Sequence, residues 1–298
     1  MKLLAHYLSA IAEEYPEIIN WRENNLNDSL FYSFRSTQYT AETYPSNLHY
    51  HDYYELVIVE EGNIRYICEG KTFWPQTGDI ILIPPRKLHM SSINAEETLY
   101  TRHVFYLYPD AFDSVRCSAL TNFLSIVTDG RNLLTLKSAE KRMLLSLLPR
   151  LDCALRPEAD DLNRALALGL TIEIFYLLSQ AQPSDEDAKN HLPQNVLSIQ
   201  QYIDQNFTEI ISVSQVAAHF FYSREYLSRL FRQHFNTTVA DYIVKRRVAH
   251  CQTLIAQGKT LSEVCYSAGF GSMTAFIRAF RTVTKMTPSQ YRSMIRQD

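Results

Sequence analysis

A short pattern occurs twice in the last third of the chain, and it limits what this segment can fold into. Each copy has a helix-capping Ser or Thr, a short apolar-periodic stretch, a tight turn, a second capping serine and a longer amphipathic stretch. The caps are Ser212 and Ser223 in the first copy and Thr260 and Ser272 in the second, so the copies lie about 49 residues apart. This arrangement predicts two helix-turn-helix units, at about 212–235 and 261–283.

The residues around these two units contain helix signals and no convincing strand pattern, which predicts an all-α domain over 193–298. Gly258 is placed to end a long helix, and Thr287–Pro288 is placed to begin the last one. The long helix, Val239–Gln257, would measure ~28 Å at ~1.5 Å per residue, close to the ~34 Å between major grooves on one side of DNA. The predicted helices are 194–206, 213–220, 223–235, 239–257, 261–268, 272–283 and 288–296.

Charge is divided unevenly along the chain. The whole sequence of 298 residues has 29 Lys and Arg against 32 Asp and Glu, a net charge of −3. Residues 193–298 have 12 basic and 6 acidic side chains, and residues 1–192 have 17 and 26, giving +6 and −9. This asymmetry indicates that the C-terminal part binds a polyanion.

Five arginines lie on the second helix of the two helix-turn-helix units, which we call the recognition helices. Arginine binds guanine in the major groove or a phosphate, Glu225 can accept from cytosine, and Ser228 and Thr274 can bond either way. A single arginine is more often part of a solvated helix face, but five on two matched helices favour DNA binding. They are Arg224, Arg229 and Arg232 on the first helix and Arg278 and Arg281 on the second.

The segments YLSRLFRQHF, DYIVKRRVAHCQTLI, EVCYSAGFGSMTAFIRAFR and TPSQYR make this region resemble the AraC/XylS DNA-binding domain over about 85 residues. The resemblance implies that the recognition helices enter adjacent major-groove segments. Ser272, the expected cap of the second recognition helix, is a further candidate DNA-binding residue. The resemblance also implies base contacts at Glu225, Ser228, Arg229, Met273, Thr274, Ile277 and Arg278, and phosphate contacts at Arg224, Arg232, Arg281 and Lys285.

Two kinds of position depart from the family pattern. Asn236 and Lys285 stand where a helix-ending glycine is usual. Asparagine tolerates the left-handed conformation and lysine is less suited to it. Met273 and Ile277 are apolar at base-contact positions, so we expect the second recognition helix to contact thymine methyl groups or to add little specificity.

The first half of the chain has strand-like sequence from Phe31 to Tyr108, followed by helical sequence. Short apolar runs separated by Gly and Pro predict strands at Leu56–Val59, Ile64–Cys68, Ile80–Ile83 and Leu99–Leu107, and a sandwich or jelly-roll barrel. An amphipathic helix is expected in the first ~20 residues. The overall class is α+β and multidomain: a cupin-like effector-binding barrel with flanking helices (1–135), a helical region suited to dimerisation (136–180, with helices at 139–151 and 161–180), a linker (181–192) and the DNA-binding domain (193–298).

Histidines in the predicted barrel follow a second familiar spacing. His49-x-His51, Glu55 and Gly62, followed by Gly78, Pro84 and His89, resemble the two cupin motifs, although Arg86 and Ile93 depart from them. In metal-binding cupins the corresponding side chains converge on one ion. The resemblance therefore implies a divalent metal site at His49, His51, Glu55 and His89, whereas packing or effector binding is the alternative use of these residues. No other cofactor is expected.

Aromatic residues are concentrated in the predicted barrel, with 12 of the 19 tyrosines before Pro109. Such side chains can stack on a sugar face or donate hydrogen bonds, so the expected effector is a small molecule, with a sugar favoured mainly by the family resemblance. The candidate effector-binding residues are Arg35, His49, His51, Tyr53, Glu55, Tyr66, Trp74, His89 and His103.

Together these features predict a cytoplasmic, effector-controlled transcriptional regulator and not an enzyme. Cys68, Cys117, Cys153, Cys251 and Cys265 are widely spaced, as in a reduced compartment, and neither a signal peptide nor a membrane span is expected. The expected partners are double-stranded DNA, the effector, RNA polymerase and a second copy of the chain, and activation is favoured by the resemblance. The alternatives are a metal-dependent cupin enzyme or a metal sensor fused to a DNA-binding domain.

Overall fold

The computed structural model describes residues 22–27, 29–40, 43–44, 48–93, 95–108, 110–113, 116–129, 131–156, 160–184, 192–209 and 212–295. The expected N-terminal helix in the first ~20 residues lies outside the described part. The chain divides into two compact units, one formed mainly by residues 3–46 and 51–190 and the other by 191–298 together with 47–50. Each unit is described below by itself.

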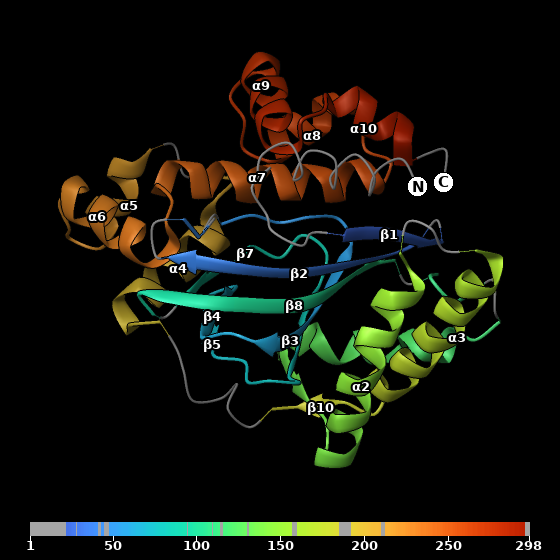
Figure 1. The fold of residues 1–298 in the computed structure, drawn as a ribbon. Coiled ribbons are helices and arrows are strands. Elements are labelled where there is room, and N and C mark those ends of the chain that lie inside the picture. The colour runs from blue at the N-terminus through green and yellow to red at the C-terminus, as the bar shows by residue number, and fades with distance from the viewer. Residues whose placement is uncertain are drawn as a thin grey trace. The chain divides into compact units, whose positions relative to one another are not determined.

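The first unit is built on a large antiparallel sheet of seven strands in the order β1-β2-β8-β3-β6-β9-β10 (Figure 1). Four of its strands, including the long β2, were not predicted. Three of the four predicted strands lie in this sheet, and the fourth, Ile64–Cys68, lies in the second sheet. The last strand falls inside the predicted linker, because Gln182 and Pro183 pair with Thr135 and Leu134 of β9. The bounds are β1 Arg22–Asn27, β2 Leu30–Thr40, β3 Tyr54–Glu61, β6 Ile80–Ile83, β8 Glu97–Leu107, β9 Leu133–Thr135 and β10 Gln182–Pro183.

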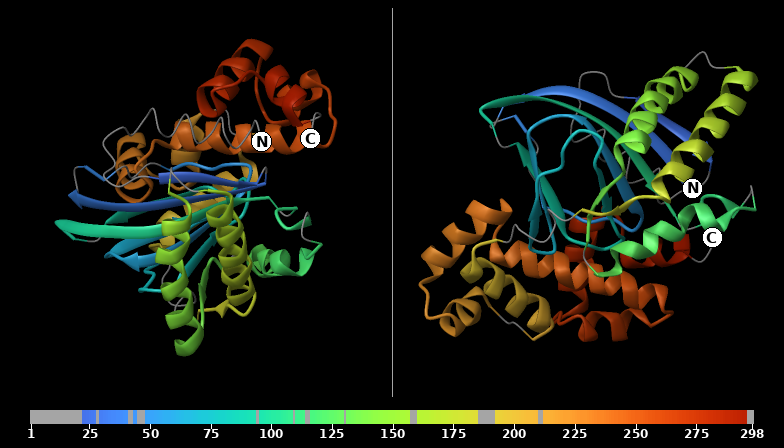
Figure 2. Two further views of the ribbon diagram at one scale, coloured as in Figure 1. Left: turned by 45° about the vertical axis from the view of Figure 1, so that its right-hand side comes forward. Right: turned by 90° about the horizontal axis from the view of Figure 1, so that it is seen from below.

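A second sheet of three strands, in the order β5-β4-β7, completes the barrel. Its strands are β5 (Lys71–Phe73), β4 (Ile64–Cys68) and β7 (His89–Ile93). Alternate residues of the two sheets belong to one cluster, which includes Tyr66 of β4, Val59 of β3 and Tyr100 of β8. We call the side chains that face this cluster the inner face of the barrel. Figure 2 shows how the strands curve around it.

Helices cover the other face of the large sheet. The strand residues that alternate with those of the inner face, such as Ile58 and Phe105, point to this other face. There they pack with helix residues such as Leu148 and Phe175 in a separate core. The helices are α2 (Ser138–Ala154), α3 (Asp161–Leu178) and the 3-10 helix η2 (Ser118–Asp129). The central part of the large sheet is therefore buried on both faces.

Between Leu192 and Ile295, the described regular elements of the second unit are all helices, and each predicted helix is confirmed to within one residue at both ends. The predicted caps are present: the Ser212, Ser223, Thr260 and Ser272 side chains accept hydrogen bonds from the first turns of α5, α6, α8 and α9. Thr260 forms a full capping box with Glu263, and Thr287 makes the same reciprocal pair of hydrogen bonds with Gln290 at the start of the last helix. The helices are α4 Gln194–Asn206, α5 Val213–His219, α6 Arg224–Phe235, α7 Val239–Ala256, α8 Leu261–Ser267, α9 Met273–Thr284 and α10 Pro288–Ile295 (Figure 1).

The long helix α7 links the two helix-turn-helix units. It has 18 residues, which corresponds to about 27 Å. Gly258 follows it with a φ of 82°, as expected of a residue that ends a helix. Among the described helices of both compact units, none combines the length and the apolar character that a membrane span requires.

Candidate nucleic-acid interface and effector site

Helices α6 and α9 are the two recognition helices, and each is fixed at its start and along one side. The Ser223 hydroxyl accepts from Tyr226 N at 3.1 Å, and the Ser272 hydroxyl accepts from Ala275 N at 3.2 Å. Apolar residues at helical spacing are buried in the unit, including Phe231 on α6 and Phe276 on α9. Because these side chains set the rotation of each helix, the opposite sides face solvent.

Nearly all of the predicted DNA contacts lie on these exposed sides. Ser228 and Met273 are partly buried at the margin of the exposed face. The Arg229 guanidinium lies 5.6 Å from the ring centroid of Tyr226, which orients it along α6. The exposed residues are Arg224, Glu225, Arg229 and Arg232 on α6, and Ser272, Thr274, Ile277, Arg278, Arg281 and Lys285 at α9.

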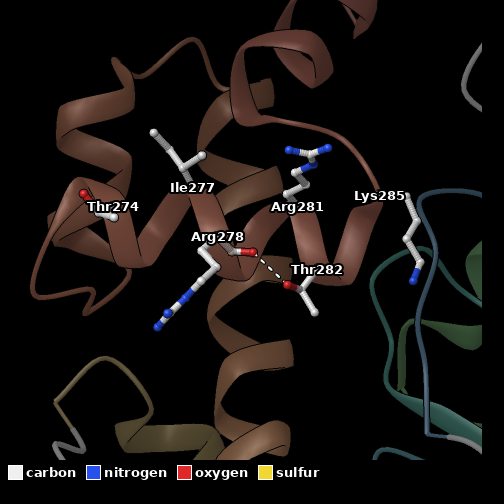
Figure 3. Close-up of a pocket in the computed structure, with 6 residues that line it drawn as sticks. All are labelled: Thr274, Ile277, Arg278, Arg281, Thr282 and Lys285. Carbon is white, nitrogen blue, oxygen red and sulfur yellow. Dashed lines mark hydrogen bonds between the residues drawn. The ribbon is translucent and has the colours of Figure 1, made fainter.

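The exposed side of α9 forms an open hollow of about 590 Å³ (Figure 3). Ile277, 40% exposed, lies about one turn after Thr274 and one turn before Arg281. Thr282 was not predicted, and its hydroxyl donates to the Arg278 carbonyl at 2.9 Å. The lining residues are Thr274, Ile277, Arg278, Arg281, Thr282 and Lys285.

Several basic residues of the C-terminal unit bind within the unit itself. Arg246 pairs with Asp204 at 2.9 Å, and Arg247 Nε donates to the Phe207 carbonyl at 2.8 Å, which ties α7 to α4 and the turn after it. Arg292 donates to the Lys259 carbonyl at 2.9 Å. The positive charge that reaches solvent is therefore concentrated on the recognition helices.

The departures from the family pattern adopt the backbone that the pattern requires. Asn236 and Lys285 follow their helices with φ of 47° and 60°, in the left-handed region. Asparagine tolerates this region, as predicted, and lysine adopts it as well. In the tight turns, Phe221 of the first helix-turn-helix unit has a φ of 56° where the second has Gly269 with a φ of 81°.

In the barrel, His51, Glu55 and His89 converge. Glu55 Oε2 lies 3.3 Å from His51 Nε2 and 3.1 Å from His89 Nε2. The Nδ1 atoms of the two histidines lie 2.8 Å from the Tyr53 and Lys87 carbonyl oxygens, respectively. Since a carbonyl oxygen only accepts, each Nδ1 carries the hydrogen, and Nε2 donates to the carboxylate when the imidazole is protonated.

The environment shifts the pKa values in this cluster. Burial opposes ionisation of Glu55, but the hydrogen bonds from His51 and His89 outweigh it and hold the pKa of that carboxyl well below its usual range. Burial lowers the pKa of His51, and the bond to Glu55 only partly opposes this. A cation placed between the histidines and the carboxylate would satisfy all three groups.

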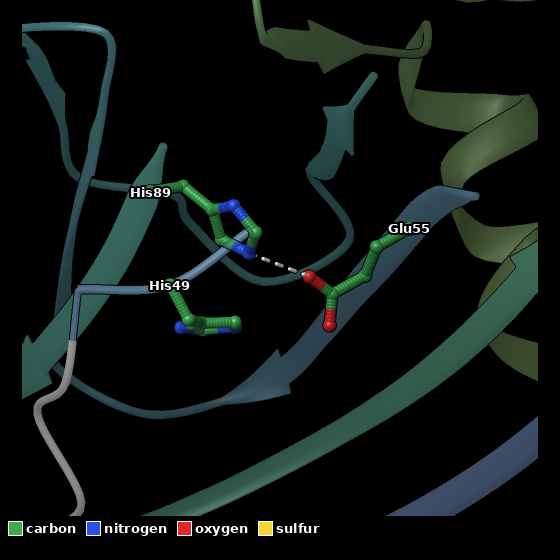
Figure 4. Close-up of side chains that lie close together, drawn as sticks. All are labelled: His49, Glu55 and His89. Atoms are coloured by element: carbon green, nitrogen blue, oxygen red, sulfur yellow. Dashed lines mark hydrogen bonds and ion pairs between the residues drawn. The ribbon is translucent and has the colours of Figure 1, made fainter. Parts of the chain in front are cut away.

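His49 lies near this cluster but not on the same strand. One ligand atom of each of His49, Glu55 and His89 lies within 4.8 Å of the others (Figure 4). His49, His51 and Glu55 do not share one face of a regular strand, because β3 begins only at Tyr54. A bend at Asp52 and Tyr53 turns the chain before the strand starts.

The other predicted effector residues divide between the inner face of the barrel and the helix-covered face of the large sheet. Arg35, Tyr53 and Tyr66 are buried on the inner face, and Trp74 is partly buried just after β5. The prediction that His103 binds the effector is wrong. His103 pairs in register with Phe34 and Ile58, which lie on the helix-covered face of the sheet, so its side chain lies on that face as well. There its ring nitrogens contact Tyr32 Oη at 2.7 Å and Glu60 Oε2 at 3.0 Å.

Sequence reasoning missed several inner-face residues. Tyr39, Tyr44, Tyr100, Arg102 and Tyr106 lie there around the predicted set. The alternation Tyr100-x-Arg102-x-Val104-x-Tyr106 was the signal that places them on one face of β8. Polar groups on this face can bind a small molecule.

Two family models match the chain. An AraC-like ligand binding domain matches residues 32–133, and a helix-turn-helix domain matches residues 216–294. Among solved structures, ToxT from Vibrio cholerae is similar, with 15% identity over 90% of this chain and 99% of that chain and a TM-score of 0.36.

Curated relatives match across both units. The HTH-type transcriptional activator RhaS of Enterobacter sp. (strain 638) is 24% identical over 248 residues, covering 82% of this chain and 86% of the relative. RhaS of Yersinia pestis (strain Pestoides F) is 21% identical over 253 residues, covering 83% and 89%. An uncharacterized HTH-type transcriptional regulator of Staphylococcus aureus (strain MRSA252) is 23% identical over 236 residues, and this chain spans 30% of its length.

These matches include regulators of transcription over both parts of the chain, and they assign it to that class and not to the enzymes. The chain belongs to the AraC family of DNA-binding transcriptional regulators, with an N-terminal AraC-like ligand binding domain and a C-terminal helix-turn-helix domain.

Proposed function

We propose that this protein is a cytoplasmic transcriptional activator that binds duplex DNA through α6 and α9 and a small effector, of the sugar class, on the inner face of its barrel. The observation that carries the DNA-binding proposal is the open hollow on α9, which combines three cations with Thr274 and Ile277. Phe276 and Phe280 on the opposite side of α9 are buried in the core, which fixes the rotation of the helix and therefore which side chains face solvent.

The chemistry of the two helices suggests different base preferences. On α6, Glu225 can accept from cytosine N4 and Arg229 can bind guanine. On α9, Ile277 and Met273 can contact thymine methyl groups, while Arg281 and Lys285 bind phosphates. We therefore expect more sequence discrimination by charged groups under α6 than under α9.

A binding-site selection from random duplex DNA tests this proposal. Arg278→Ala and Arg281→Ala should each weaken binding, and loss of a phosphate contact should also reduce the slope of log affinity against log salt by about 1. Lys259→Ala is the matched control, because Lys259 is exposed in the same unit but lies outside both recognition helices. A strong guanine preference under α9 that survives Arg278→Ala would contradict the proposed contacts.

Dimerisation through the helical region of the first unit is a further part of the proposal. Leu162 and Leu166 are 79% and 46% exposed on α3, and Tyr176 is 57% exposed farther along the same helix. Exposed apolar side chains at helical spacing favour burial against a second copy. A monomeric mass at high concentration, unchanged in Leu162→Glu, would exclude this interface.

Activation of RNA polymerase is proposed because relatives across both units are named activators. A reporter promoter placed beside the selected DNA site tests the sign of regulation. Transcription that rises with the wild-type chain, and not with Arg278→Ala, supports an activator. Transcription that falls identifies a repressor that uses the same DNA contacts.

A second candidate function is metal sensing, favoured by the geometry of His51, Glu55 and His89. Each histidine has its Nδ1 hydrogen fixed by a backbone carbonyl, the arrangement that commonly orients a metal-binding imidazole. Two Nε2 atoms and one carboxylate oxygen then form a donor set suited to Zn²⁺, Ni²⁺, Mn²⁺ or Fe²⁺.

Metal analysis of the purified chain and calorimetric titration with ZnCl2 or NiCl2 test this candidate. Stoichiometric binding should be lost in His51→Gln and retained in His103→Gln, since His103 faces the other side of the sheet. A sensor also requires that the metal change the affinity for DNA. Equal metal content in the two variants would exclude the site.

A further inference from the structure

Arg102 is a partly buried cation on the inner face of the barrel, and the described residues of the barrel give it no counter-charge. It lies on β8 between Tyr100 and Val104, which share its face. Its Nη1 is out of reach of solvent and has no hydrogen-bond partner, although the side chain as a whole is only partly buried. Among the described residues, no carboxylate oxygen lies within 4 Å of the Arg102 guanidinium.

The groups around Arg102 are aromatic and hydroxylic. The guanidinium carbon lies 4.2 Å from the ring centroid of Tyr100. Tyr39, Tyr44 and Tyr66 also surround it, and Tyr39 Oη is buried without a hydrogen-bond partner. Tyr66 and Tyr100 are joined through their hydroxyls at 2.8 Å. This ring of tyrosines supplies hydrogen-bond donors and flat surfaces but no full negative charge.

A second arginine lies directly opposite Arg102, on the neighbouring strand of the same sheet. Arg35 of β2 is in register with Arg102, and directly opposed like charges destabilise a strand pair. The two guanidinium groups diverge along the strands: Arg35 donates to Ser33 Oγ and Tyr106 Oη, each at 3.2 Å, while Arg102 lies among the tyrosines. This divergence keeps the two positive charges apart.

The nearest inner-face carboxylate is already used. Glu55 is in register with Tyr106, whereas Arg102 is in register with Val59, so the two positions are four residues apart along β3, or about 13 Å. Glu55 is held by His51 and His89. Among the described residues of these strands, the inner-face carboxylate is therefore engaged by histidines, and Arg102 is left without a counter-charge.

We propose that the effector is an anion, and that its carboxylate or phosphate group binds the Arg102 guanidinium within the ring of tyrosines. An arginine fork matches either group through two parallel hydrogen bonds. The remainder of the effector would contact the tyrosine rings and hydroxyls. This inference rests on the proposal that the barrel holds the effector, and it narrows the sugar class to acidic or phosphorylated members.

Thermal unfolding of the full chain with three related probes tests the proposal. The probes are D-glucose, D-glucuronate and D-glucose 6-phosphate at equal ionic strength, and they separate a neutral ligand, a carboxylate and a phosphate. At least one anion should raise the unfolding temperature of the first unit and D-glucose should not, because a ligand that binds only the folded state stabilises it. Whichever anion acts identifies the group.

Arg102→Met and Arg65→Met form a matched pair of variants. Arg65 is the neighbour of Tyr66 on β4, so its side chain points away from the inner face. On that outer side, Arg65 Nε donates to Ser92 Oγ at 3.1 Å. Affinity for the anion should fall roughly 10- to 100-fold in Arg102→Met, as expected for loss of hydrogen bonds to a charged group, and should persist in Arg65→Met. Without ligand, Arg102→Met should unfold at the wild-type temperature or above it.

Three results would overturn the proposal: stabilisation by D-glucose alone, no stabilisation by either anion, or an equal anion effect in Arg102→Met. A marked loss of ligand-free stability in Arg102→Met would overturn it as well, since it would assign the arginine to packing. DNA binding by the wild-type chain, measured in parallel, separates these failures from a failure of the proposed regulator function.

Discussion

Replacing Gly269 by alanine should disable the second helix-turn-helix unit. Gly269 lies in the turn between α8 and α9, with a φ of 81°. A Cβ at this position would lie 2.1 Å from the Thr208 carbonyl oxygen, and 2.7 and 2.8 Å from the carbon and Cα of the same residue. The obstacle is backbone in the segment after α4, so no side-chain rotation can remove it.

Two costs add in this variant. Alanine in the left-handed region costs about 1–2 kcal/mol. Reaching even the 3.0 Å limit for a Cβ contact requires the carbonyl oxygen to move by about 0.9 Å, from 2.1 Å. Overpacking of this kind costs about 1–3 kcal/mol, so we expect a total loss of about 2–5 kcal/mol.

Gly258→Ala separates the two costs. Gly258 has a φ of 82°, and no atom lies within 4 Å of the position that a Cβ would take there, so only the backbone cost applies. Far-UV circular dichroism of the full chain in increasing urea should show a loss for Gly269→Ala that exceeds the loss for Gly258→Ala by about 1–3 kcal/mol. Tryptophan fluorescence is the internal control, because Trp21 and Trp74 both precede the C-terminal unit. Equal losses in the two alanine variants would refute the steric reasoning.

Three further outcomes are expected. Thr260→Ala removes the hydroxyl that accepts from Glu263 N at 3.3 Å and should cost about 1 kcal/mol in urea denaturation, whereas Thr260→Ser should cost less. Burial, with a smaller contribution from Arg246, lowers the pKa of His250 from its usual value of 6.5, so the folded protein favours the neutral imidazole. The free energy of unfolding should therefore be unaffected by this group above pH 6.5 and should fall as the pH drops below that value. His250→Gln should reduce this dependence on pH. Cys153 is exposed and should react first with a thiol reagent, because Cys68, Cys251 and Cys265 are buried and burial also raises the pKa of Cys251. Mass mapping that found Cys251 modified first would contradict this order.

The DNA-binding half of the site was predictable because its signals are local. Ser223 and Ser272 cap helices that begin at the next residue, and helical spacing alone separates Phe231 and Phe276 from the exposed arginines. Sequence reasoning missed Thr282, although it lies one turn after Arg278 on the same face of α9.

The effector half was less predictable because the large sheet is buried on both faces. Where both faces are covered, a strand has apolar residues at nearly every position, and alternation does not distinguish one face from the other. On β8, Tyr100 and Phe105 are equally buried but belong to different cores. His103 was therefore assigned to the wrong face, and Arg102, its neighbour, was overlooked.

Local sequence signals are sufficient to predict the two-part architecture, the described helices of the C-terminal unit and the residues displayed on α6 and α9, because caps and helical periods act over a few residues. Which side chains share the inner face of the barrel depends instead on how distant strands pair. The pairing of Arg35 with Arg102 joins residues 67 positions apart, in a register set by the whole β2–β8 pair. A shift of one residue in that register would move every β8 side chain to the other face, so the position of a buried charge follows from packing of the sheets and not from its neighbours in sequence.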